Sequence, residues 1–107
     1  MPNSNLTKRW GEGVHNPQRN DLVAALNELN KKDAEHPNCW LSTEEGWSLS
    51  VFESGLVVFE NIETGEGPWH MRAVSRESAL DLWQLLLQAN ELVSLQAKPW
   101  VSGYGNT

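Results

Sequence analysis

The residues best placed to do chemistry are His70 and Arg72, which lie in a segment with the pattern of a β-strand. Side chains two positions apart on a strand point to the same side of a sheet, and Glu60 in a neighbouring predicted strand can join them. Because histidine titrates near neutral pH, this group could bind an anion or transfer a proton. If Trp69 and Met71 face the core, however, His70 and Arg72 belong simply to the solvent side of the sheet.

Zinc binding and nucleophilic catalysis find little support in the histidines and the single cysteine. A structural zinc site needs several closely spaced Cys and His ligands, whereas His36-Pro37-Asn38-Cys39 supplies only two. Cys39 precedes Trp40 in a predicted strand, a context that predicts a buried and unreactive thiol. The chain has no Gly-x-Ser-x-Gly sequence and no dinucleotide-binding glycine pattern. We therefore expect a protein that is not an enzyme and that needs no cofactor or metal.

The whole chain has a formal net charge of -6, and its acidic residues are concentrated in the later part. Residues 1–37 contain five bases and five acids, whereas residues 38–107 contain three bases and nine acids. Six glutamates, with no Lys or Arg among them, are Glu44, Glu45, Glu53, Glu60, Glu63 and Glu66. Such a charge disfavours nucleic acid and anionic membranes as partners. It favours a basic protein partner, because charge complementarity increases association rate and specificity.

The chain contains six tryptophans. Four occupy predicted strands or the second predicted helix and can form an aromatic cluster in the core: Trp40, Trp47, Trp69 and Trp83. Trp10 and Trp100 lie outside the predicted regular elements. Because tryptophan is enriched at the energetic centres of interfaces, Trp100 joins the six glutamates as a candidate partner-binding residue.

The hydrophobic pattern places all these residues in one domain that covers residues 16–107. Residues 1–15 are polar and lack an apolar period, so they predict a mobile N-terminal arm. Asn16-Pro17 is typical of a helix start and opens a predicted helix over 17–32, and Ser75 caps a second over 76–89. Alternation of apolar and polar residues predicts strands over 38–42, 47–53, 56–62 and 69–74. An irregular C-terminal segment is expected to follow the second helix.

The gaps between the predicted strands are too short for parallel crossovers. The sequence therefore predicts an α+β, two-layer sandwich, in which a three- to four-stranded antiparallel meander carries two main helices on one face. With no long apolar stretch and no signal sequence, we expect a cytoplasmic protein that does not span a membrane.

The leading functional hypothesis is a small, acidic, non-enzymatic interaction protein that binds a basic partner through an acidic sheet face. Small acidic α+β proteins of this general kind occur among immunity proteins, antitoxins and inhibitors. One alternative is a small-molecule or anion site, or a minor enzyme, centred on His70 and Arg72. Another is a homodimeric domain that pairs through an exposed sheet face or edge.

Overall fold

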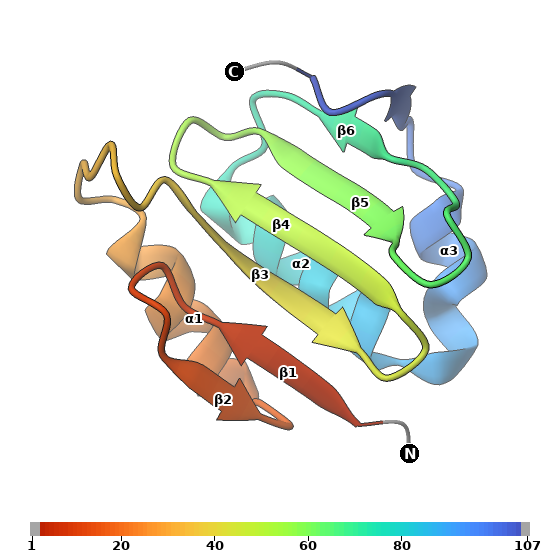
Figure 1. Cartoon of the computed structure of the whole chain (residues 1–107), viewed down its shortest axis with the longest axis horizontal. Coiled ribbons are helices and arrows are strands. Elements are labelled where there is room, and N and C mark those ends of the chain that lie inside the picture. The colour runs from red at the N-terminus through yellow and green to blue at the C-terminus, as the bar shows by residue number, and fades with distance from the viewer. Residues whose placement is uncertain (1–2, 106–107) are drawn as a thin grey trace.

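Alternating apolar residues build the centre of an antiparallel sheet in the computed structural model, which describes residues 3–105 (Figure 1). Within that range the strands are β1 (Ser4–Thr7), β2 (Gly13–His15), β3 (Asn38–Thr43), β4 (Trp47–Phe52), β5 (Val57–Asn61), β6 (Trp69–Met71) and β7 (Val101–Ser102). Their order across the sheet is β2-β1-β3-β4-β5-β6-β7, and every neighbouring pair is antiparallel.

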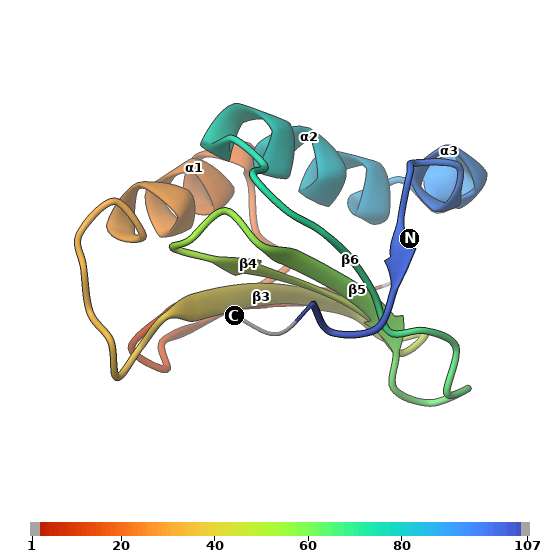
Figure 2. The same ribbon diagram turned by 90° about the horizontal axis from the view of Figure 1, so that it is seen from above.

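In the described part of the chain, three helices lie on one side of this sheet: α1 (Arg19–Glu28), α2 (Arg76–Leu87) and α3 (Leu92–Gln96) (Figure 2). A 3-10 turn, η1 (Ala89–Glu91), joins α2 to α3. The sheet turns its apolar face towards them: Trp47, Leu49 and Val51 of β4 are buried, while the intervening serines are partly exposed. Strand alternation thus produces one buried face and one open face. No helix among the described residues is long and apolar enough to cross a membrane.

Trp83 of α2 occupies the centre of the core and has no solvent-exposed surface. Its indole Nε1 donates a hydrogen bond of 2.9 Å to the backbone carbonyl of Leu49. The bond satisfies the one polar atom of a large side chain, which can therefore be fully buried. Ser75 caps this helix as predicted, since its hydroxyl accepts a hydrogen bond from the N–H of Ser78.

The structure confirms the predicted α+β class and the antiparallel sheet, but the predicted number of strands is wrong. The expected N-terminal arm contributes β1 and β2, and the expected irregular C-terminus contributes α3 and β7. Leu6 is the single apolar residue of β1 and is fully buried. One apolar position produces no period, which is why the sequence pattern misses this strand. The first helix is also shorter than the predicted range 17–32, since it covers Arg19–Glu28 and its N-cap is Gln18 rather than Asn16.

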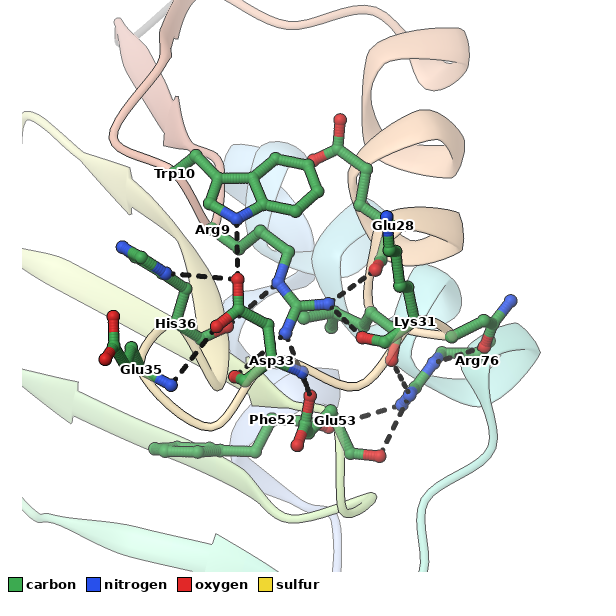
Figure 3. A network of polar contacts seen from close by, with 12 residues as sticks. Arg9, Trp10, Glu28, Lys31, Asp33, Glu35, His36, Phe52, Glu53 and Arg76 are labelled. Carbon is green, nitrogen blue, oxygen red and sulfur yellow. Dashed lines mark hydrogen bonds and ion pairs between the residues drawn. The ribbon is translucent and has the colours of Figure 1, made fainter.

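Arg9 ties the N-terminal strands to the rest of the domain (Figure 3). Its guanidinium is buried and lies 2.8 Å from the carboxylate of Glu53. It also donates to the backbone carbonyls of four residues at and beyond the end of α1: Glu28, Lys31, Asp33 and His36. The last carbonyls of a helix have no hydrogen-bond donor within the helix. Here the Arg9 side chain supplies donors to the end of α1 and to the residues that follow it.

Trp10 and Arg76 complete this polar network. The indole of Trp10 lies 5.4 Å from the Arg9 guanidinium and donates to Asp33 at 2.9 Å. Arg76 donates to the backbone carbonyls of Leu29, Phe52 and Glu53. Two arginines thus hold the end of α1 against the turn that follows β4, and the expected arm is part of the fold.

Candidate functional site

The six predicted glutamates do not share one surface. Glu44 and Glu45 lie in the β3–β4 turn, and Glu63 and Glu66 lie in the β5–β6 loop; all four are exposed. Successive turns of an antiparallel meander alternate between its two ends, so these two loops meet at one end. We call these four residues, together with Ile62, the acidic end.

Glu53 and Glu60 lie elsewhere. Glu53 follows β4 at the opposite end of the sheet, where its carboxylate accepts hydrogen bonds from Arg9 and from the N–H of Asp33. The Asp33 N–H and the Arg9 guanidinium hold the pKa of Glu53 below its usual value. Glu60 lies in β5, and its carboxylate accepts a hydrogen bond of 2.9 Å from the hydroxyl of Tyr104. This bond raises the pKa of the tyrosine.

Asn61 fastens the two loops of the acidic end to each other. Its side-chain amide donates to the carbonyl of Glu45 at 3.1 Å. Its amide oxygen accepts from the N–H groups of Glu63 and Thr64 at 2.9 and 3.0 Å. A backbone bond from Ile62 to Gly46, also 2.9 Å long, adds a second link. Because Asn61 is itself buried, the loops rest on an ordered polar anchor.

Gly46 is required where these loops approach each other. Its φ of +93° lies in the region that favours glycine, and a Cβ there would lie 2.6 Å from the Asn61 amide oxygen. Next to this contact Ile62 projects outwards with 71% of its surface exposed. The acidic end therefore presents one exposed apolar side chain and four exposed glutamates on a well-fastened pair of loops.

An aromatic cluster adjoins the acidic end, with the buried Phe59 at its centre. The Phe59 ring centroid lies 4.9 Å from that of Trp47, 5.8 Å from that of Trp69 and 5.3 Å from that of Trp100. Trp100, a candidate partner-binding residue, is thus half-buried within this cluster. Trp40 was predicted in a core cluster but faces the open side of the sheet and is 37% exposed, because the core side of β3 carries Cys39 and Leu41.

Of the two residues of the alternative site, His70 lies against the C-terminal segment. His70 of β6 pairs with Val58 of β5 and Val101 of β7, and its Nδ1 lies 2.8 Å from the carbonyl oxygen of Gly103. This end of the chain passes on the side of the sheet opposite the helices (Figure 2). Arg72 is exposed and follows the last residue of β6, so the strand that was expected to place it beside His70 ends too early.

Cys39 is buried, as predicted, and desolvation raises the pKa of its thiol to about 12. The neighbouring candidate His36 is exposed and contacts the carboxylate of Asp33 at 3.1 Å. Among residues 3–105, no group of three or more His, Cys, Asp or Glu side chains could hold a metal ion.

The thiol of Cys39 is expected to react with a disulfide reagent such as Ellman's reagent at least about 100-fold more slowly in the folded protein than in urea. Burial blocks access to the sulfur, and the raised pKa removes the reactive thiolate. The measurement is the rate of absorbance change at pH 8 with and without denaturant. Equal rates in the two states would show that the thiol is accessible in the folded protein.

Sequence reasoning missed Asn61 and Ile62 as parts of this region, whereas it correctly placed Trp69 in an aromatic cluster. The run Asn61-Ile62-Glu63-Thr64-Gly65 carries a signal that could have identified the turn, because an asparagine side chain commonly accepts bonds from N–H groups two and three residues on.

Comparison with known proteins adds no assignment: no protein-family model, no curated protein and no solved structure matches the chain.

Proposed function

We propose that the protein is a non-enzymatic interaction module that binds a basic partner protein through its acidic end. The observation that carries this proposal is the exposed Ile62 on the same pair of loops as the exposed Glu44, Glu45 and Glu63, which Asn61 fastens together. An isoleucine with this exposure contributes little to the core and is accessible to a partner.

The arrangement has the composition expected of a small interface. Interfaces commonly combine an apolar centre with a polar, charged rim. Ile62 supplies the apolar centre and the glutamates supply the rim. Because the loops are ordered before binding, a partner would not have to meet the entropic cost of fixing them. The carboxylates would accelerate encounter with a positively charged surface.

The rival hypothesis places a ligand at His70 and Arg72. It is less well supported, because the C-terminal segment lies against His70 and the strand that carries His70 ends before Arg72. Under that hypothesis His70→Ala would abolish ligand binding, and charge changes at the acidic end would have no effect.

The test is affinity capture from the source organism followed by identification of the captured protein. The triple variant Glu44→Lys, Glu45→Lys and Glu63→Lys is expected to bind the partner at least about tenfold more weakly than the wild type does. A matched control, Glu12→Lys, Glu35→Lys and Asp81→Lys, makes the same change in net charge at exposed positions away from the acidic end. We expect the control to retain binding within about threefold.

Retention of the partner by both triple variants would contradict the proposal. Equal loss in both would also contradict it, because net charge rather than the acidic end would then govern binding. A captured partner without a basic surface would likewise exclude the proposed mode of recognition.

A further inference from the structure

A hollow of about 370 Å³ opens beside the acidic end. It is lined by Phe59, Glu66, Trp69, Gln96, Lys98 and Trp100. Glu66 belongs both to this hollow and to the acidic end, so the two features form one continuous surface. The volume lies near the lower end of the range for ligand pockets, which suits a single side chain better than a large cofactor.

The walls of this hollow are aromatic and fixed in position. Phe59 is fully buried, and the half-buried rings of Trp69 and Trp100 are tilted against it by 35° and 31°. The Trp100 indole Nε1 donates to the Leu95 carbonyl at 2.9 Å, which holds that ring in one orientation. Indole faces carry negative electrostatic potential and therefore attract cations.

The polar groups around the hollow favour a cation that can also donate hydrogen bonds. Glu66 supplies a carboxylate and Gln96 an amide oxygen, both of which accept hydrogen bonds. The Glu66 carboxylate is oriented by the hydroxyl of Thr64, which donates to it at 3.2 Å. An anion would be repelled by Glu66 and by the indole faces. Lys98 is the one lining residue with a positive charge, which repels a cation. Its replacement by a neutral residue should therefore strengthen the binding of a cation and weaken the binding of an anion.

We propose that this hollow, which we call the arginine pocket, receives an arginine side chain of the basic partner, an inference that rests on the proposed function. A guanidinium is planar, weakly hydrated and rich in donors, so it stacks on indole rings while it donates to a carboxylate. A lysine ammonium lacks the planar stacking surface and is more strongly hydrated.

The probe is N-acetyl-arginine methylamide, titrated into the ¹⁵N-labelled protein while the indole N–H signals of Trp69 and Trp100 are followed by NMR. We expect saturable shifts with a Kd of about 1 to 10 mM, typical of a single side chain without the rest of an interface. The citrulline derivative, which has nearly the same shape but no charge, is the matched control ligand and is expected to cause no saturable shift.

Three variants test the assigned roles. Glu66→Gln is expected to weaken binding of the arginine probe about threefold to fivefold, the size of an exposed ion pair. Glu63→Gln removes the same charge from the same loop without lining the pocket, and binding is expected to stay within about 1.5-fold. Lys98→Gln is expected to strengthen binding about twofold, because it removes the opposing charge.

Equal binding of the arginine and citrulline probes would overturn the inference. So would equal weakening by Glu66→Gln and Glu63→Gln, or the absence of saturable shifts up to about 50 mM. Failure of the arginine pocket can be distinguished from failure of the proposed function, because Glu44, Glu45 and Glu63, which test that function, do not line the pocket. If the wild-type protein captures a basic partner but does not bind the arginine probe, the pocket hypothesis alone is wrong. If the protein binds the arginine probe but captures no basic partner, the proposed function alone is wrong.

Discussion

Replacement of Arg9 by methionine is expected to destabilise the domain by about 3 kcal/mol or more, measured as the free energy of unfolding in urea. The substitution leaves the carbonyls at the end of α1 without the donor that now serves them. It also removes the cationic partner of Glu53. Because methionine fills part of the volume of the buried arginine side chain, the loss of unfolding free energy reflects chiefly the lost polar contacts.

The matched control for this substitution is Arg19→Met. Arg19 is exposed at the first position of α1, where a positive charge faces the unfavourable end of the helix dipole. We expect the control to change stability by less than about 0.5 kcal/mol. An Arg9→Met protein within about 1 kcal/mol of the wild type would show that the N-terminal segment is not fastened as described.

Truncation of Trp83 to alanine is expected to cost about 3 to 5 kcal/mol of unfolding free energy, the usual range for a buried aromatic side chain. Trp83 has no exposed surface, and the truncation leaves a cavity between α2 and the sheet. It also removes the indole donor that serves the Leu49 carbonyl. Urea unfolding followed by circular dichroism measures this change.

Trp40→Ala is the matched control, since it removes the same side chain from the open face of the sheet, where Trp40 is 37% exposed. Its expected cost is smaller, about 1 to 2 kcal/mol, because part of the Trp40 side chain already contacts solvent. A Trp83→Ala variant that loses no more stability than Trp40→Ala would contradict the assigned orientation of α2.

The central hairpin was predictable because its signals are local. The alternation in β4 and the Ser54-Gly55 turn specify both strands and their connection, and Gly55 has the positive φ of +92° that such a turn uses. The N-terminal strands were not predictable in this way. They are stabilised by one buried leucine and by the contacts of Arg9 with residues 19 to 44 positions away, and neither leaves a periodic pattern.

The candidate site was predictable in part. The density of glutamates between positions 44 and 66 indicates an acidic region but not its shape. The order of strands alone could have separated Glu53 from the others, because consecutive turns of a meander lie at opposite ends. The arginine pocket required more, since Trp100 reaches Phe59 only when the C-terminal segment returns to pair with β6.

The most direct test of binding through the acidic end is the association rate with the captured partner at two salt concentrations. For the wild type and for the variant altered at Glu12, Glu35 and Asp81, we expect the rate to fall about tenfold between low and high salt. For the variant altered at Glu44, Glu45 and Glu63, we expect a slow rate with little dependence on salt. The same salt dependence in all three proteins would contradict binding through the acidic end.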